Sequence, residues 1–372
     1  MKAEKQKETA PNPSVGADAG QSSKTKSVDI IPTKPANIKK NNGSLQTISM
    51  SELYDTSYEP KSVLIDGLLC AGTYLFVGAP KIGKSFFMAQ LSYHVAMGLP
   101  LWDYEVHQGT VLYLALEDDY ARLQKRLSQM FGVDGCDHLH FATQAKTLCT
   151  GLDEQLCTFL KEHPNTKLII IDTLQKVREV GGDRYSYASD YEIVARLKAF
   201  SDAHKLCLLV VHHTRKMEAT DSFDMISGTN GLLGAADGAF ILQKKKRTDN
   251  NAVMEVVGRD QQDQELTLNF DRERCVWTFV KAETELWKVP PDPTLEKVTT
   301  LLTENAPEWH GSPTELLERL PDLEMQANVL TRYLNVNAER LFNEYGILCE
   351  SKRTHDGRQV KLAKVRDGIL WA

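Results

Sequence analysis

The chain has 372 residues, of which 42% are hydrophobic and 25% charged, so it is long enough for two globular domains with sizeable cores. Its formal net charge of −6 excludes attraction to nucleic acid by bulk charge and leaves that role to local basic patches. No apolar run is long enough to span a membrane, and seven scattered cysteines form no CxxC pair. We therefore expect a cytoplasmic protein with free thiols and no membrane contact.

Composition divides the chain into four parts. Residues 1–48 are rich in Lys, Ser, Pro, Asn and Gln, and we expect a disordered tail because they cannot bury enough apolar surface to offset the entropy of ordering. Residues 49–285 alternate strands and helices, which predicts an α/β domain with a mainly parallel central sheet. A proline-rich linker at 286–293 leads to a small C-terminal domain at 294–372.

The α/β domain has clear predicted elements in chain order. Apolar strands are expected at 74–77, 110–116, 138–142, 167–171, 207–212, 238–243, 253–257 and 266–270. Helices are expected at 84–97, 119–130, 153–162 and 187–204. The last three strands follow one another closely, with turn signals between them, so they predict an antiparallel meander at the edge of the sheet.

A glycine-rich motif stands between the first strand and the first helix. It reads GAPKIGKS, which matches G-x-x-x-x-G-K-[ST] at all four specified positions. Its backbone N–H groups and the helix N-terminus suit phosphate oxygens, and the setting of strand, loop and helix predicts binding of ATP with Mg²⁺. The expected nucleotide contacts are Gly78, Ala79, Pro80, Lys81, Ile82, Gly83, Lys84, Ser85 and Phe86, with Lys84 on the β- and γ-phosphates and Ser85 on Mg²⁺.

Two further strands end in carboxylates. Asp172 follows the run LIII and would lie at the same sheet edge as the phosphate loop, where it can support Mg²⁺. Glu117 follows the run LYLAL and could deprotonate the attacking water, with Asp118 as a weaker alternative. Asp118 and Asp119 could also cap the next helix.

A third strand ends in two histidines, His212 and His213. Adjacent strand residues point to opposite faces, so only one of them can face the γ-phosphate, and we select His213. Zinc is disfavoured because no further His/Cys pair stands at ligand spacing.

The C-terminal domain predicts three helices followed by a β-hairpin. Helical patterns cover 294–305, 313–319 and 327–345, and the strands 347–353 and 358–365 are joined by a turn containing Asp-Gly. This order is typical of a winged helix-turn-helix. Residues 325–372 carry eight basic and five acidic residues, so the last helix and the wing are expected to form the basic end of this domain.

The strand ends GAPKIGKS, YLALEDD, LIIIDTL and VVHHTRK, in this order, resemble those of RecA-like ATPases, in particular the RepA plasmid helicase branch and its mobile-element relatives. The resemblance covers residues 52–280. It implies a RecA-like core with Lys84 and Ser85 in the phosphate loop, Glu117 as catalytic base, Asp172 as Mg²⁺ support and His213 as γ-phosphate sensor. It also implies a hexameric ring in which a neighbouring subunit completes each ATP site.

The resemblance places that neighbour's basic residue at Arg259, although the lysine that related ring helicases often carry two residues earlier is replaced by Val257. The basic run 244–247 is an alternative donor, or a DNA contact. Loops 175–189 and 214–234 would face the pore and bind single-stranded DNA, while the winged domain could bind duplex DNA or a protein.

Two other functions stay open. The chain could be a non-translocating ATP switch in which nucleotide controls DNA binding, or a regulator whose function lies in the winged domain alone. A helicase or helicase-like replication protein of a plasmid or mobile element is the leading interpretation.

Overall fold

The structure is a computed structural model that describes residues 45, 47–178, 187–213, 231–246, 248–259, 261–283, 290–355, 357–366 and 369–370. Met1–Ser49 and Met50–Ala372 form two separate units. The disordered tail expected at 1–48 lies almost wholly outside the described residues, and so does half of the linker at 286–293.

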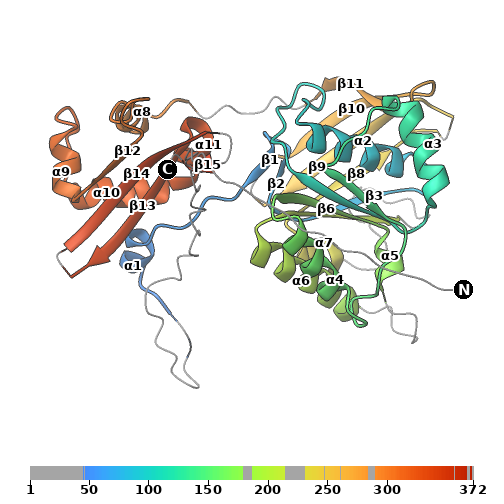
Figure 1. The fold of residues 1–372 in the computed structure, drawn as a ribbon, viewed down its shortest axis with the longest axis horizontal. Helices are drawn as coiled ribbons and strands as arrows, with labels where there is room; N and C mark the ends of the chain where they lie inside the picture. The colour runs from blue at the N-terminus through green and yellow to red at the C-terminus, as the bar shows by residue number, and fades with distance from the viewer. Residues whose placement is uncertain are drawn as a thin grey trace, which may run out of the picture. The chain divides into compact units, whose positions relative to one another are not determined.

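A nine-stranded sheet is the centre of the α/β domain (Figure 1). Its order is β11 (Val276–Ala282), β10 (Gln264–Asp271), β9 (Asn251–Gly258), β8 (Gly238–Gln243), β3 (Gly72–Gly78), β7 (Cys207–His213), β6 (Thr166–Asp172), β4 (Thr110–Ala115), β5 (Leu139–Ala142). Strands from β8 to β5 pair in parallel, and β8 to β11 pair antiparallel. The predicted mainly parallel sheet with an antiparallel edge is confirmed, with β11 as an additional, unpredicted strand.

Helices cover both faces of this sheet (Figure 1). One face carries α2 (Lys84–Met97) and α3 (Tyr120–Phe131), and the other carries α4 (Leu152–Glu162), α6 (Tyr187–His204) and α7 (Gly231–Ala235). The four predicted helices are confirmed to within one residue at each end. Because both faces are covered, the central strands are apolar throughout rather than alternating, as in β3, where every residue is buried.

Local sequence explains where these helices begin and end. Gly98 ends α2 with a φ of 65°, and its N–H donates to the carbonyls of His94 and Val95, a left-handed cap that favours glycine. The Asp119 carboxylate accepts a hydrogen bond from the N–H of Arg122 and caps α3. The cap expected from Asp119 is thus present.

Short elements precede the sheet. They are α1 (Met50–Asp55), β1 (Val63–Ile65) and β2 (Leu69–Cys70), of which β1 and β2 pair antiparallel. A further short helix, α5 (Leu174–Val177), directly follows β6.

The C-terminal domain consists of α8 (Pro293–Thr299), β12 (Glu308–Gly311), α9 (Pro313–Glu318), α10 (Ala327–Val336), α11 (Ala338–Tyr345), β13 (Ile347–Thr354), β14 (Gly357–Arg366) and β15 (Ile369–Leu370). The predicted hairpin is confirmed as β13–β14, and β12 pairs with β14 to give the order β12-β14-β13. Ser312 and Glu315 form the N-terminal capping box of α9. The winged-helix assignment itself stays a prediction.

Three details of this domain differ from expectation. The predicted helix 327–345 is interrupted at Asn337, whose side-chain amide donates to the Tyr333 carbonyl and so competes with helical hydrogen bonding. The first helix ends at Thr299 rather than residue 305, and at its end the Thr299 and Thr300 hydroxyls donate to backbone carbonyls three residues earlier. Residues 308–311, which lie between the first two predicted helices and for which no strand is predicted, form β12 through long-range pairing with β14.

Trp277 on β11 is fully buried, so replacing it by alanine should open a large cavity in the core. We expect Trp277→Ala to lower the free energy of unfolding by about 3–5 kcal/mol, measured by urea denaturation. Val280→Ala on the same strand is the matched control, because Val280 is 55% exposed and should change stability little. Equal effects of the two substitutions would show that β11 does not seal the core.

Candidate functional site

The phosphate loop joins the end of β3 to the start of α2. Its backbone turns through left-handed conformations at Lys81, with φ 65°, and at Gly83, with φ 110°. A side chain at Gly78 would place its Cβ 2.7 Å from the carbonyl oxygen of Leu242 on the neighbouring strand. The loop therefore needs glycine at Gly78 for close packing and at Gly83 for its backbone conformation.

Trp277 supports this loop from the edge of the sheet. Its indole Nε1 donates to the Gly83 carbonyl over 3.2 Å, and a Cβ at Gly83 would lie 2.9 Å from the indole ring. Gln90 on α2 exchanges two hydrogen bonds with the Trp277 backbone, at 2.8 and 2.9 Å. The edge strand β11 thus fixes the position of the loop, a role that no pattern in the sequence predicts.

Lys84 lies almost entirely out of water, with 5% of its surface exposed. Its Nζ donates to the carbonyls of Gly78 and Ala79 over 2.7 and 3.0 Å and to His213 Nδ1 over 2.9 Å. Burial lowers the pKa of Lys84 to about 8, although the nearby Asp172 and Glu117 carboxylates act in the opposite direction. The direct hydrogen-bond partners of this ammonium are neutral, so a triphosphate here would add negative charge in direct contact with it.

Ser85 and Asp172 lie side by side at the first turn of α2. The Ser85 hydroxyl donates to Asp172 Oδ2 over 2.7 Å, and the Tyr113 hydroxyl donates to the same oxygen over 2.9 Å. Burial raises the pKa of Asp172 despite these hydrogen bonds. A hydroxyl and a carboxylate beside the phosphate loop fit Mg²⁺, which takes a few protein oxygens and completes its coordination with phosphate and water.

Glu117 reaches the same edge from the turn after β4. Its carboxylate accepts a hydrogen bond of 3.1 Å from Thr173, the residue after Asp172, and its side chain is 48% exposed. Asp118, the weaker alternative base, is 9% exposed and pairs with Arg126 at 2.7 Å and Arg122 at 3.2 Å. Those ion pairs leave Glu117 as the carboxylate that water can reach.

His213 is the histidine at the site. Its Nδ1 faces Lys84, and its Nε2 lies 4.0 Å from Glu117 Oε1, whereas His212 is buried with 7% exposed. Burial first, and the Lys84 charge second, lower the pKa of His213, so the neutral imidazole is favoured. The neutral ring can accept the hydrogen bond from Lys84.

Phe86, the last expected nucleotide contact, belongs to an aromatic surface beside the loop. Its ring centroid lies 5.4 Å from that of Phe270, and the Arg126 guanidinium lies 5.0 Å above the Phe86 ring. Lys244 Nζ lies 5.6 Å from the Phe270 centroid and 5.1 Å from that of Trp277. The first residue of the basic run 244–247 thus packs on the chain's own phosphate-loop edge, and Arg247 lies outside the described residues.

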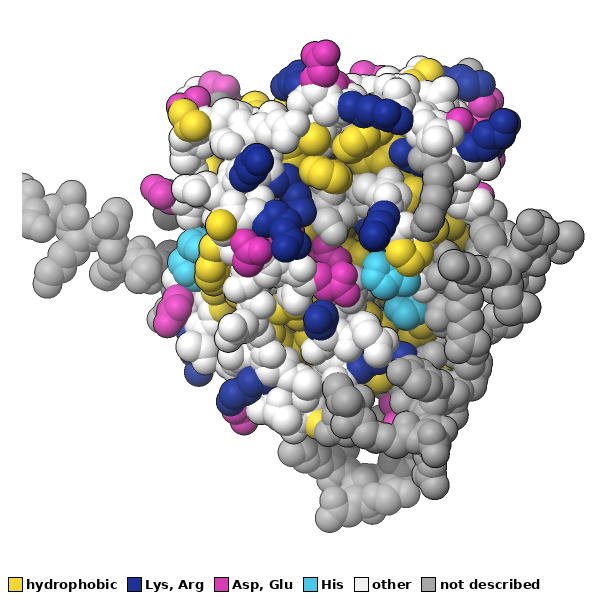
Figure 2. Space-filling model, turned by 90° about the vertical axis from the view of Figure 1, so that its right-hand side faces the viewer, with side chains coloured by type: hydrophobic (Ala, Val, Ile, Leu, Met, Phe, Trp, Pro, Cys, Tyr) yellow, Lys and Arg dark blue, Asp and Glu magenta, His cyan; other side chains and the backbone are white. Residues whose placement is uncertain are grey.

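Figure 2 looks onto the edge where the parallel strands end, and basic, acidic and histidine side chains meet near the centre of this face. Five of the predicted site residues lie close to one another at the carboxyl ends of the parallel strands: Lys84, Ser85, Glu117, Asp172 and His213. Sequence reasoning missed the supporting groups Tyr113, Thr173, Arg126 and Trp277. Only Thr173 carried a possible signal, since it directly follows Asp172.

Arg259 does not join this group. Gly258, the residue before it, pairs with Gly238 at the start of β8, whereas the phosphate loop follows the other end of β3. Four residues of strand separate Tyr74, which pairs with Gly238, from Gly78, a distance of about 13 Å. Arg259 instead donates to the Gly234 carbonyl over 2.9 Å.

The two expected DNA loops are described only in part. Residues 179–186 and 214–230 lie outside the described residues. At their borders, residues 174–177 form α5, residues 231–235 form α7, and Arg178 is buried with 8% exposed.

Residues 41–219 match the model of the AAA domain family. The chain is also 22% identical over 205 residues to DNA repair protein RadA of Streptococcus pyogenes, in serotypes M1, M6 and M18. That similarity covers 52% of this chain and 41% of the relatives, so the chain spans about two fifths of their length. The family match, the phosphate loop and the parallel sheet together support a RecA-like P-loop ATPase.

Two solved structures share similarity with 57% of the chain. One is the ATPase domain of another protein, with 12% identity, a TM-score of 0.48 and 85% of that chain covered. The other is a DnaB-like replicative helicase solved for its interactions with primase, with 13% identity, a TM-score of 0.48 and 59% covered.

Two kinds of feature are absent from the described residues. No group of three or more His, Cys, Asp or Glu residues among them could hold a metal ion. None of the helices in this part of the chain is long and apolar enough to cross a membrane.

The lowered pKa of Lys84, about 8, predicts proton uptake when ATP binds. Phosphate charge favours the ammonium, so the pKa of Lys84 should rise and about half a proton should be taken up at pH 8, but none by this group at about pH 6. Calorimetric titration with a Mg²⁺-bound non-hydrolysable ATP analogue, in two buffers of different ionisation enthalpy, measures this uptake. Lys84→Arg is the control, since a guanidinium stays charged; equal uptake by both proteins would contradict the assignment to Lys84.

Proposed function

We propose that this protein is a DNA-dependent ATPase, a RepA-like ring helicase that acts in replication or mobilisation of a plasmid or mobile element in the cytoplasm. The observation that carries the ATPase part is the meeting of Lys84, Ser85, Glu117, Asp172 and His213 at one edge of the sheet. DNA as the partner is supported by the RadA relatives, which are named as DNA repair proteins.

In this proposal each site residue has a separate role in ATP binding or hydrolysis. Lys84 and the backbone of the phosphate loop bind the triphosphate, while Ser85 and Asp172 hold Mg²⁺, which offsets charge on the phosphates. The aromatic surface of Phe86 and Phe270 offers a place for the base to stack. Glu117 orients the attacking water and accepts its proton, with Thr173 holding the carboxylate in position.

His213 links this chemistry to the chain beyond β7. Its hydrogen bond to Lys84 has to change when Lys84 turns to phosphate, because the same ammonium cannot keep every present partner. The chain continues from His213 directly into residues 214–234, the second expected DNA loop. In this proposal, hydrolysis changes the position of His213 and with it the loop 214–234 that binds single-stranded DNA.

A neighbouring subunit completes the site in this proposal. Arg259 lies at the sheet edge away from its own phosphate loop, and this position supports the proposal that it serves the ATP of another copy. Lys244 packs on the rings beside its own loop, which favours Arg259 as the donor in trans. A hexameric ring would supply such a neighbour for every site.

A non-translocating ATP switch is the alternative. It is favoured by the C-terminal domain, in which the cation-bearing hairpin β13–β14 packs with α9, α10 and α11 around a core of its own. Such a unit could hold duplex DNA without any translocation on a single strand.

Hydrolysis should depend on Glu117 and be stimulated by single-stranded DNA. We expect Glu117→Gln to retain ATP binding and to lower kcat by about 10²–10⁴-fold, because the amide cannot accept a proton. The measurement is phosphate release with and without single-stranded DNA, together with strand displacement. Lys84→Ala provides the inactive reference, and ATPase activity indifferent to DNA would favour the switch over the motor.

Mixing two inactive variants tests the intersubunit site. Lys84→Ala keeps Arg259 but loses its own ATP site, and Arg259→Ala keeps its ATP site but loses the donor. Because each defect then lies on a different face of the subunit, mixed rings should recover part of the ATPase activity that neither variant shows alone. Arg274→Ala, a change on an exposed turn, serves as the control partner, and absence of recovery would remove Arg259 from the site.

A further inference from the structure

The N-terminal helix α1 and the residues that follow it lie against the C-terminal domain. The Asp55 carboxylate accepts a hydrogen bond of 2.8 Å from Arg332 Nε on α10 and lies 3.2 Å from an Arg358 guanidinium nitrogen on β14. One carboxylate thus bridges two arginines that come from the helix and from the hairpin. The Arg332 hydrogen bond holds the pKa of Asp55 below its usual value, so the carboxylate is charged at neutral pH.

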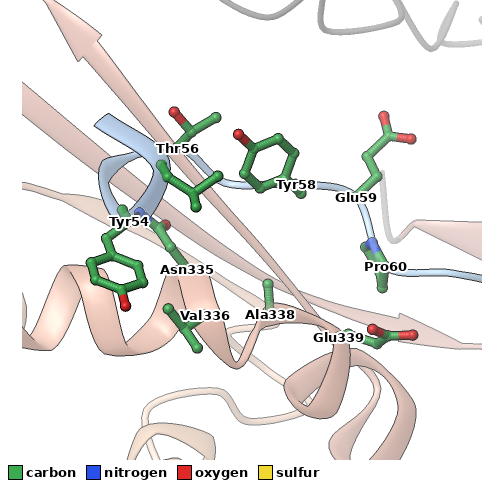
Figure 3. Close-up of a pocket in the computed structure, with 10 residues that line it drawn as sticks. Tyr54, Thr56, Tyr58, Glu59, Pro60, Asn335, Val336, Ala338 and Glu339 are labelled. Atoms are coloured by element: carbon green, nitrogen blue, oxygen red, sulfur yellow. Dashed lines mark hydrogen bonds between the residues drawn. The ribbon is translucent and has the colours of Figure 1, made fainter. Parts of the chain in front are cut away.

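Two further hydrogen bonds join residues 54–57 to the C-terminal domain. Asn335 on α10 donates its side-chain amide to the Tyr54 carbonyl over 2.9 Å, and the Ser57 hydroxyl donates to the Cys349 carbonyl on β13 over 3.0 Å. Figure 3 shows Thr56 and Tyr58 on one side of a groove and Val336 and Ala338 on the other, with the ring of Tyr54 beside Val336. The groove encloses about 280 Å³, so the segment does not fill the space against α10 and α11.

Helix α1 is held against the C-terminal domain by few buried contacts. Helix α1 has only six residues and none of them is buried; Met50 is 67% exposed, Leu53 44% and Tyr54 37%. Its attachment is therefore a few hydrogen bonds and partly exposed ion pairs, which contribute little stability each. Seven residues, 56–62, connect α1 to β1, so a released α1 would stay tethered within about 25 Å of β1.

The face that α1 covers suits phosphate. Guanidinium groups recognise carboxylates and phosphates with the same planar pattern of donors, so Asp55 stands where a phosphate oxygen could lie. Arg353 is exposed on the same hairpin and pairs in register with Arg358, so these two arginines lie on one face of it. Several cations on one helix-and-hairpin face match the repeated charges of a nucleic-acid backbone better than a single acidic side chain.

We propose that α10 and the β13–β14 hairpin form a binding surface for the phosphates of duplex DNA, and that Asp55 occupies this surface until the duplex displaces α1. Arg332 and Arg358 are its central contacts. The inference rests on the proposed function only in taking DNA as the partner, since the ATP site has no part in it.

Binding of a labelled duplex of random sequence to the full chain, without nucleotide, tests the surface. Asp55→Asn removes the competing charge, and we expect it to bind the duplex about fivefold more tightly, because two arginines are released for phosphate. Glu59→Gln is the matched control: it removes the same charge from the same segment, but Glu59 pairs with Lys205 on the α/β domain, so its affinity should change less than about twofold.

The arginine variants should act in the opposite direction. Arg332→Gln and Arg358→Gln should each weaken binding to all sequences and reduce the slope of log K against log salt by about one, as expected for a lost phosphate contact. In Asp55→Asn combined with Arg332→Gln, the gain should be largely lost. Lys84→Ala should bind the duplex as the unchanged protein does, which separates this surface from failure of the ATPase proposal.

Hydrogen exchange on the unchanged protein gives an independent measurement. The backbone amides of α1 and of Ser57 should exchange faster when duplex is added. The proposal is overturned if Asp55→Asn binds duplex no more tightly than the unchanged protein, or if α1 keeps its protection. It is also overturned if labelled polyglutamate binds Asp55→Asn more tightly than the duplex does, since the surface would then fit an acidic protein.

Discussion

The buried charge of Lys84 is the constraint on which the ATP site depends. An ammonium with 5% exposure needs partners in every direction, and it has the Gly78 and Ala79 carbonyls, His213, and the nearby carboxylates of Asp172 and Glu117. These groups lie at or just beyond the ends of parallel strands, so the topology of the sheet brings the partners of the Lys84 ammonium together. A phosphate loop without that sheet edge would leave the lysine charge without compensation.

The antiparallel edge of the sheet has a structural role in the same site. Trp277 donates to the Gly83 carbonyl, Gln90 binds the Trp277 backbone, and the Trp102 indole donates to the Trp277 carbonyl over 2.8 Å. The phosphate loop is thereby held between the parallel strands and a strand that comes much later in the chain. The same meander carries Arg259 at its opposite end.

Charge pairing recurs away from the ATP site. Asp55 forms ion pairs with Arg332 and Arg358. This cluster lies at a partly exposed surface, and Asp55 belongs to a helix of only six residues. A buried pair such as Asp237 with Lys198, at the start of β8, is permanent by comparison, because Asp237 is 5% exposed and also accepts from the Thr73 N–H. The difference in burial separates a structural ion pair from one that a ligand can displace.

The sequence by itself determined the phosphate loop, the helices around it and the strand-end residues Glu117, Asp172 and His213, because motif spacing and hydrophobic periodicity are local properties of the chain. The hairpin β13–β14 was predictable from its turn for the same reason. Only the tertiary structure decided that Trp277 supports Gly83, that Tyr113 bonds to Asp172, that β12 pairs with β14 and that Asp55 meets Arg332. These contacts join residues dozens to hundreds of positions apart, and no local pattern specifies which distant residue fills a given place.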